Sequence, residues 1–152
     1  MFKVLMVCTG NICRSPIAEG LLSHYLPENL KSAVEVRSAG THALHGNQAD
    51  KNAIRAMHQI GIDIAGHRAR QISREIARRS DLVLTMEAEH TRRIKGLLKW
   101  GDHPRRISEF NPKEPIHDIA DPYGGPVEAF DQCIRTLRPS IKGVIMWLGN
   151  NL

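Results

Sequence analysis

The sequence lacks any long hydrophobic run. No apolar segment in its 152 residues approaches 18, the length that a membrane-spanning helix requires. The apolar start, residues 1–8, is too short for a secretory signal and lacks its cleavage pattern. Cysteine is also scarce, and three is an odd number that argues against a secreted disulfide scaffold. We therefore expect a cytoplasmic protein without membrane insertion, whose cysteines serve packing, redox chemistry or catalysis.

Internal repeats, an acidic tail and Ser/Gly-rich linkers are also absent, so the sequence predicts no domain boundary within residues 1–152. The hydrophobic share of 41% and the charged share of 24% exclude a disordered or collagen-like chain. Surface scaling indicates that about 69% of the unfolded surface becomes buried in a chain of this size. One domain with a core that needs no metal or disulfide is the expected organisation.

The net charge of +5 is distributed unevenly. Residues 68–106 contain eleven Lys or Arg against five Asp or Glu, which indicates an electropositive edge and an anionic partner. Aromatic residues, which would alternate with basic ones in a nucleic-acid surface, are limited to Trp100 in this stretch. Glu89 is spaced to pair with Arg92 and Arg93 on a helix. We expect a solvated face that steers acidic phosphoprotein tails, and no nucleic-acid partner.

Strand and helix patterns alternate along the chain. Within residues 3–7, apolar side chains occupy both odd and even positions, as in a strand that is buried on both faces. A polar, glycine-containing loop follows, and then a helix with Ser15 as N-cap and Pro16 in the first turn. The apolar residues of this helix repeat on one face at Ile17, Ala18, Leu21, Leu22, Tyr25 and Leu26.

The alternation continues with predicted strands at residues 34–38, 81–85 and 105–108, and predicted helices at 50–60, 87–100 and 127–148, the last with a possible kink at Pro139. This order indicates an α/β protein with a four-stranded parallel sheet, right-handed crossovers and helices on both faces. Ligands of such folds bind beyond the carboxyl ends of the strands, where residues 8–15 would lie.

The loop after the first strand has the spacing C-x5-R, from Cys8 to Arg14. The predicted phosphate-binding residues are Thr9, Gly10, Asn11, Ile12, Cys13, Arg14 and Ser15. A loop around an oxyanion turns its backbone N–H groups inward, and Gly10 can adopt dihedrals that a side chain resists. The following helix adds its positive end, and the Arg14 guanidinium can hold two phosphate oxygens. A nucleotide-binding P-loop is disfavoured because that motif requires Gly-Lys-Ser/Thr.

Cys8 is the candidate nucleophile at the floor of this cradle. Cationic surroundings and a helix N-terminus lower cysteine pKa values to roughly 3.5–7.5 in proteins. The Ser15 hydroxyl could donate a hydrogen bond to the sulfur, so the sequence predicts a preformed thiolate that needs no histidine base. The alternative is a buried cysteine that only packs. A zinc site with Cys13 is disfavoured, because no second ligand pair has the required spacing.

Cleavage of a phosphate ester also needs an acid that protonates the leaving oxygen. The best candidate is Asp121, which begins the segment Asp-Pro-Tyr-Gly-Gly-Pro. Proline and glycine hold this segment as an exposed turn, and Tyr123 could pack against an aryl substrate. Taken alone, the segment could be an ordinary turn; together with the Cys8 loop it indicates a general acid.

The segments 7–16 and 121–123, supported by 38–41, 66–71 and 84–86, resemble the low-molecular-weight protein tyrosine phosphatases, especially bacterial members. The resemblance implies a phosphotyrosine phosphatase I-like, Rossmann-like fold of three layers. It also implies a two-step hydrolysis through a phosphocysteine, with Cys8 as nucleophile, Arg14 as phosphate clamp and Asp121 as acid and then base. The family reaction needs no metal or cofactor.

The same resemblance assigns supporting roles and a context. Asn11, Ser15, Ser38 and His67 would form the hydrogen-bond network that supports the loop. Leu44 and Tyr123 would form the substrate wall, which is shallower than in vertebrate members because Gly124 replaces their second tyrosine. Cys13 would form a reversible disulfide with oxidised Cys8, although it could also simply pack. Cys133 is expected in the core. The implied partner is a phosphotyrosine protein, such as a bacterial tyrosine autokinase of exopolysaccharide export, acted on by a monomer or weak oligomer.

Two other functions are disfavoured by the sequence. A thioredoxin-coupled arsenate reductase would need further cysteines in a later segment, and residues 74–100 contain none. A phosphoprotein-binding module would cradle phosphate without turnover, and the presence of both Cys8 and Asp121 argues against it. The sequence therefore favours a protein tyrosine phosphatase.

Overall fold

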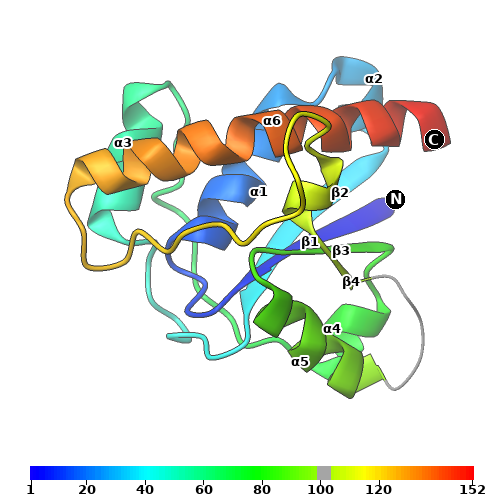
Figure 1. Ribbon diagram of the computed structural model, residues 1–152, viewed down its shortest axis with the longest axis horizontal. Helices are drawn as coiled ribbons and strands as arrows, with labels where there is room; N and C mark the ends of the chain where they lie inside the picture. The colour runs from blue at the N-terminus through cyan, green and yellow to red at the C-terminus, as the bar shows by residue number, and fades with distance from the viewer. Residues whose placement is uncertain (99–103) are drawn as a thin grey trace.

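The computed structural model describes residues 1–98 and 104–152, in which four strands form one sheet (Figure 1). The strands are β1 (Phe2–Cys8), β2 (Val34–Gly40), β3 (Leu82–Thr85) and β4 (Pro104–Arg106), in the spatial order β2-β1-β3-β4. All three pairings are parallel, so the four carboxyl ends lie at the same edge. The predicted four-stranded parallel sheet is confirmed.

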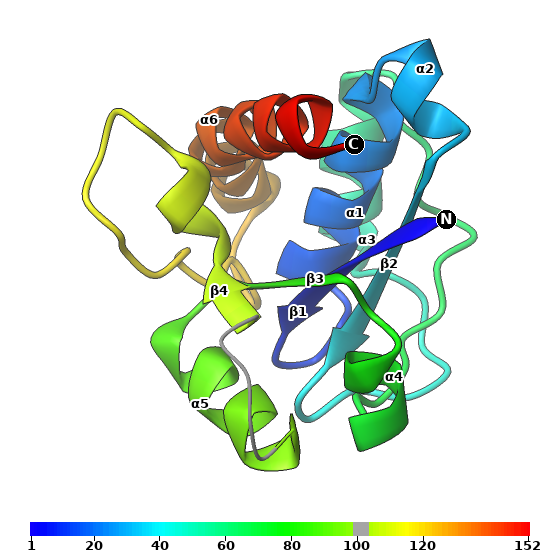
Figure 2. The ribbon, with the colours of Figure 1, turned by 90° about the vertical axis from the view of Figure 1, so that its right-hand side faces the viewer.

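Helices cover both faces of this sheet. They are α1 (Arg14–Tyr25), α2 (Glu28–Lys31), α3 (Lys51–Gln59), α4 (Arg74–Arg78), α5 (Ala88–Leu98) and α6 (Val127–Asn151), with the 3-10 helix η1 (Ile107–Phe110) after β4. Figure 2 shows α1, α3 and α6 on one side of the strands and α4 and α5 on the other. The result is the three-layer arrangement that the sequence predicted.

Alternate side chains of β1 point to opposite faces of the sheet, which explains why helices pack on both faces. Val4 and Met6 belong to the larger apolar cluster, which includes residues of α1, α3 and α6. Leu5 and Val7 point to the opposite face and join the smaller cluster with α4 and α5. All four side chains are at most 1% exposed, so β1 is a central strand whose carboxyl end is held firmly in place.

Several predicted boundaries are wrong. The first helix begins at Arg14, and Ser15 is not its N-cap: Cys13 takes that position without a side-chain cap, while the Ser15 hydroxyl bonds inside the loop. Tyr25 ends this helix and is 42% exposed rather than buried with its apolar face. The last strand ends at Arg106, where the chain turns into η1.

The remaining helices differ in length or were missed. α6 runs three residues past the predicted end at 148 and continues through Pro139 as one helix. α5 follows the predicted helix 87–100, whose last two residues lie outside the described part of the chain. α2 and α4 have four and five residues, too few for a 3.6-residue apolar repeat to be recognised.

Gly143 permits the close packing of α6 on η1. A Cβ at this position would lie 1.7 Å from the carbonyl oxygen of Phe110, a distance that only backbone movement could relieve. We expect Gly143→Ala to destabilise the protein by about 3 kcal/mol or more. Gly149→Ala on the same helix is the matched control, because its Cβ meets nothing within 4 Å. The higher helix propensity of alanine should stabilise the folded protein by at most about 1 kcal/mol. Urea unfolding measures both; equal midpoints would contradict the close approach.

Candidate active site

The loop between β1 and α1 turns its carbonyl groups away from its centre. The oxygens of Cys8, Thr9 and Gly10 accept hydrogen bonds from the N–H groups of Thr41, His42 and Leu44, at 2.9, 2.9 and 3.1 Å. Those of Asn11 and Ile12 accept from His67 Nε2 at 2.7 Å and Asp50 N at 2.8 Å. In a planar trans peptide the N–H points opposite to the C=O. Five successive N–H groups, from Thr9 to Cys13, therefore face the inside of the loop, as an oxyanion site requires.

Asn11 is the residue of this loop whose backbone has a left-handed conformation. Its φ is +59°, a conformation in which asparagine is more common than most residues. The expectation that Gly10 would supply the unusual dihedral is wrong, since the positive-φ glycines are elsewhere. The glycine that matters is Gly40 at the end of β2, where a Cβ would lie 2.4 Å from the Thr9 oxygen. Its missing side chain lets the loop lie directly on β2.

Cys8 lies at the floor of a pocket of about 250 Å³. Its side chain is 2% exposed, and its Sγ is 2.9 Å from Ser15 Oγ. α1 begins at Arg14, so the positive end of the helix macrodipole also points at this loop. The sulfur thus faces a hydroxyl, a helix N-terminus and inward-facing amides, which together favour an anion.

The Arg14 side chain is buried and lines the same pocket as Cys8, with 1% of the residue exposed. Its Nη1 donates to Glu87 Oε2 at 2.5 Å and to the Ile119 carbonyl at 2.8 Å. Its Nη2 lies 3.4 Å from Asp121 Oδ2. The guanidinium therefore has a fixed plane, and it brings the predicted acid Asp121 to the mouth of the pocket. Sequence analysis missed Glu87, which no local pattern connects to Arg14.

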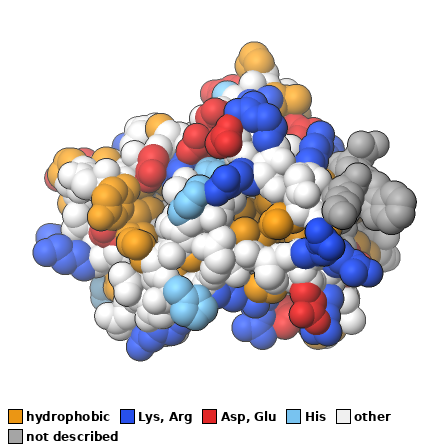
Figure 3. All heavy atoms as spheres, turned by 90° about the horizontal axis from the view of Figure 1, so that it is seen from below, with side chains coloured by type: hydrophobic (Ala, Val, Ile, Leu, Met, Phe, Trp, Pro, Cys, Tyr) orange, Lys and Arg blue, Asp and Glu red, His pale blue; other side chains and the backbone are white. Residues whose placement is uncertain are grey.

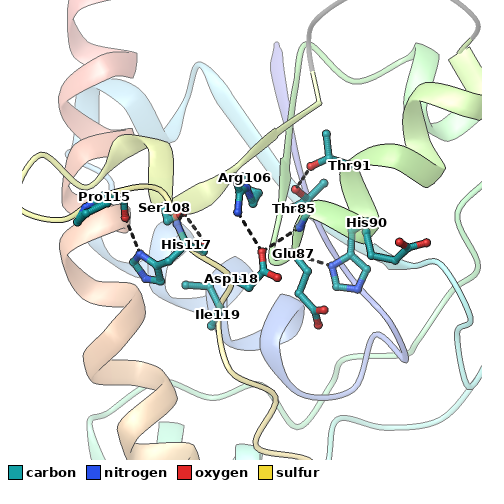
Figure 4. A network of polar contacts seen from close by, with 12 residues as sticks. Thr85, Glu87, His90, Thr91, Arg106, Ser108, Pro115, His117, Asp118 and Ile119 are labelled. Carbon is teal, nitrogen blue, oxygen red and sulfur yellow. Dashed lines mark hydrogen bonds and ion pairs between the residues drawn. The ribbon is translucent and has the colours of Figure 1, made fainter.

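The segment before Asp121 is anchored to the edge of the sheet (Figure 4). Asp118 Oδ1 accepts from the Ala88 N–H at 2.9 Å and from Arg106 Nη1 at 3.1 Å. Burial raises the Asp118 pKa, but these hydrogen bonds outweigh it and the pKa is lowered overall. Ile119 N also donates to Met86 O at 2.9 Å. These contacts hold Asp121 near the loop although the turn itself is exposed.

His90 is a second residue that sequence analysis missed, because no local pattern marks it as buried. It is 3% exposed. Its Nδ1 accepts from the Glu87 N–H at 3.1 Å, an interaction drawn in Figure 4. Nε2 therefore carries the proton and donates to Thr9 Oγ1 at 2.9 Å. Burial and the Arg14 charge lower the His90 pKa, which keeps the imidazole neutral beside the Cys8 loop.

The predicted supporting residues meet behind the loop. Asn11 Oδ1 accepts from the Arg70 N–H at 2.9 Å, and Nδ2 donates to Ser15 Oγ at 2.8 Å and Ser38 Oγ at 3.0 Å. His67 contacts the Asn11 carbonyl, as described above. All four residues that the resemblance assigned to this network therefore lie together.

Apolar side chains form the outer walls of the pocket. The pocket is lined by Cys8, Thr9, Gly10, Ile12, Cys13, Arg14, His42, Leu44, Asp121 and Tyr123. Leu44 and Tyr123 are 44% and 63% exposed, so their apolar surface is available to a bound group. Both residues that the resemblance implied for a substrate wall therefore line this pocket, and their role in substrate binding stays a prediction.

The other two cysteines are buried. Burial raises the pKa of Cys13, and the charge of Asp50 adds to the effect. Burial also raises the pKa of Cys133 to about 12. Both are protonated at neutral pH, and all three cysteines are free. Cys133 lies in the core as expected, while the redox role implied for Cys13 stays a prediction.

Several arginines of the basic stretch 68–106 form ion pairs. Lys and Arg side chains are scattered over the face shown in Figure 3. Four arginines pair with carboxylates: Arg79 with Glu75, Arg92 with Glu89, Arg105 with Glu109 and Arg106 with Asp118. Within residues 1–98 and 104–152, no three His, Cys, Asp or Glu side chains are grouped to hold a metal. Among the described helices, none has the length and apolarity to cross a membrane.

Comparison with known proteins points to one family. A family model described as low molecular weight phosphotyrosine protein phosphatase matches residues 3–151. A probable low molecular weight protein-tyrosine-phosphatase, EpsP of Ralstonia nicotianae, is 39% identical over 147 residues, which cover 95% of this chain and 92% of the relative.

Solved structures of two phosphatases have the same fold as this chain. The tyrosine phosphatase Wzb from Escherichia coli K30, in complex with sulphate, has a TM-score of 0.84 at 35% identity, with 98% of this chain and 100% of that one covered. The YwlE arginine phosphatase from Geobacillus stearothermophilus has a TM-score of 0.87 at 33% identity, with 99% and 95% covered.

Proposed function

The chain belongs to the low molecular weight phosphotyrosine protein phosphatase family, and from this we propose that its reaction takes place at Cys8, with Arg14 and Asp121 as its partners. The protein is a protein-tyrosine phosphatase, a hydrolase of phosphoric monoesters. The observation that carries the residue assignment is the placement of the Cys8 sulfur inside a loop whose amides face inward, with Asp121 Oδ2 3.4 Å from Arg14. The proposed phosphatase domain is the whole of residues 1–152.

In the first step, the Cys8 thiolate attacks phosphorus and the P–O bond to the tyrosine breaks. The phenolic oxygen leaves with a proton from Asp121, which becomes a carboxylate. Arg14 and the loop amides bind the three equatorial oxygens. They stabilise the transition state more than the ground state, because they are already fixed where the charge develops. The Glu87 and Ile119 contacts prevent Arg14 from rotating away.

In the second step, water attacks the phosphocysteine. The Asp121 carboxylate takes a proton from this water, the P–S bond breaks, and Cys8 leaves as a thiolate. The products are inorganic phosphate and an enzyme returned to its starting protonation state. The sulfur is a good leaving group for the reason that made it reactive: the Ser15 hydroxyl and the loop amides stabilise its negative charge.

The pocket walls favour an aryl phosphate. Ile12, Leu44 and Tyr123 offer apolar surface to a phenyl ring, whereas the polar guanidinium of phosphoarginine would lose hydration there without a partner of opposite charge among these three side chains. The similarity to an arginine phosphatase therefore supports the fold and the phosphate loop of this chain. The choice of phosphotyrosine as substrate is supported by the apolar pocket walls.

A panel of three peptides of one sequence, carrying phosphotyrosine, phosphoserine or phosphoarginine, tests this choice. We expect kcat/KM for phosphotyrosine to exceed both others by at least about 100-fold, because only the phenyl ring fills the apolar walls, and because a phenol is also a better leaving group than the alcohol of serine. Phosphate release measures all three. A phosphoarginine peptide hydrolysed as fast as the phosphotyrosine peptide would overturn the proposed substrate.

We further propose that the physiological partner is a phosphotyrosine protein such as a bacterial tyrosine autokinase of exopolysaccharide export. Support comes from the bacterial relatives named above as tyrosine phosphatases. The reaction needs a reduced Cys8, which a reducing cytoplasm would maintain. A phosphorylated autokinase of this kind, added to the peptide panel as a protein substrate, should lose its phosphotyrosine; retention of the phosphate would contradict this partner.

A further inference from the structure

Arg93 on α5 lies at the rim of the Cys8 pocket. Its Nη2 donates to His42 Nε2 at 2.5 Å, and His42 is one of the residues that line the pocket. The Arg93 side chain is exposed. Its neighbour Arg92 pairs with Glu89, whereas Arg93 has no carboxylate partner in the part of the chain that the structure describes. A cation is thus held at the entrance of the pocket, and the phosphatase reaction described above does not use it.

The loop that carries His42 is fixed on both sides. The His42 N–H donates to the Thr9 carbonyl at 2.9 Å. The Gln71 side chain bonds to the backbone of the residues before and after His42, at 2.7 and 2.8 Å. Because an arginine only donates, His42 Nε2 accepts from Arg93 and the imidazole is neutral. The Arg93 guanidinium therefore has a preset position, and binding an anion costs it less conformational entropy than it would cost a freely rotating arginine.

The pocket has room for the phosphorylated side chain only. Its volume of about 250 Å³ lies below the roughly 300–1,000 Å³ of sites that enclose a drug-sized ligand. The residues on either side of a phosphotyrosine therefore remain outside the pocket. They lie at its rim, where His42 holds Arg93.

The charges at this rim favour an acidic peptide when the reaction begins. Asp121 carries a proton in the first step, as its role as general acid requires, and Glu87 is paired with Arg14. A guanidinium binds a carboxylate through charge-assisted hydrogen bonds. We propose that Arg93 is a specificity-determining residue that binds a Glu or Asp directly beside the phosphotyrosine of the substrate. This inference rests on the proposed function, because it adds a preferred flanking residue to the same site.

Three phosphotyrosine peptides test the inference: one with Gln on both sides of the phosphotyrosine, one with Glu before it and one with Glu after it. We expect kcat/KM for at least one Glu peptide to exceed that for the Gln peptide by about 3- to 5-fold, near the upper limit for an exposed ion pair. In Arg93→Gln this ratio should fall below about 1.5-fold, because the variant lacks the charge. Hydrolysis of p-nitrophenyl phosphate, which has no flanking residues, should be unchanged by the substitution.

Arg135→Gln is the matched control, because it lowers the net charge by the same amount. Arg135 is an exposed residue of α6 that donates to Gln132 and does not line the pocket, so its replacement should preserve the wild-type ratio. A wild-type enzyme that prefers neither Glu peptide would overturn the inference. A preference that persists in Arg93→Gln, or is lost equally in Arg135→Gln, would also overturn it, as would an equal loss for p-nitrophenyl phosphate in Arg93→Gln. Failure of the wild type to hydrolyse any of the three peptides would instead overturn the proposed function.

Discussion

Serine at position 8 is expected to abolish hydrolysis of both phosphotyrosine and p-nitrophenyl phosphate, with kcat falling by at least about 10⁴-fold. An alcohol is a much weaker nucleophile than a thiolate near neutral pH, and the loop that stabilises an anionic sulfur cannot ionise a hydroxyl to the same extent. The inward-facing amides and Arg14 remain, so Cys8→Ser should still bind phosphate. Steady-state kinetics measures the first effect, and calorimetry with inorganic phosphate measures the second.

Cys133→Ser is the matched control for this variant. Cys133 is buried on α6, and its pKa of about 12 keeps the thiol protonated. Its replacement is expected to lower stability while kcat changes by less than about 3-fold. More than about 1% residual activity in Cys8→Ser would mean that another group is the nucleophile.

Asn at position 121 is expected to slow phosphotyrosine hydrolysis by about 10²- to 10³-fold. The amide cannot give a proton to the phenolic oxygen, which then leaves as an unassisted phenoxide. p-Nitrophenyl phosphate has a leaving group that is stable without a proton, so its hydrolysis should be slowed far less. The ratio of the two losses, measured as kcat/KM for each substrate, reports the acid role directly.

Asp81→Asn provides the control for the loss of one carboxylate. Asp81 precedes β3 at the amino edge of the sheet, opposite the pocket, where it accepts from the Lys3 N–H at 2.8 Å. Its replacement should leave both substrates unaffected. Equal slowing of both substrates in Asp121→Asn would contradict a general acid and would indicate that Asp121 only shapes the pocket.

The fold was largely predictable because its signals are local. Short windows of sequence show the apolar residues at both odd and even positions of residues 3–7. They also show Gly61, which follows α3 and has a φ of +82°. Ser15 misled the prediction for the same reason: a serine before Pro16 is a typical N-cap, and only the folded loop reveals that its hydroxyl is bonded to Cys8.

The proposed phosphate-binding loop could be located in the sequence from C-x5-R, but the residues that hold it in place were less predictable. Arg14 contacts the Ile119 carbonyl across 105 residues of sequence and Glu87 across 73. Contacts of this range depend on strand order and on where the crossovers return the chain, which no short pattern encodes. The burial of His90 has the same origin, since it follows from the position of α5 against the loop.

The position of an oxyanion in crystals soaked with vanadate tests the central claim most directly. The account predicts vanadate inside the loop, with vanadium bonded to Cys8 Sγ, its oxygens within hydrogen-bond distance of the amides from Thr9 to Cys13, and the Arg14 guanidinium contacting two of them. Vanadate bound elsewhere, with this loop empty, would contradict it.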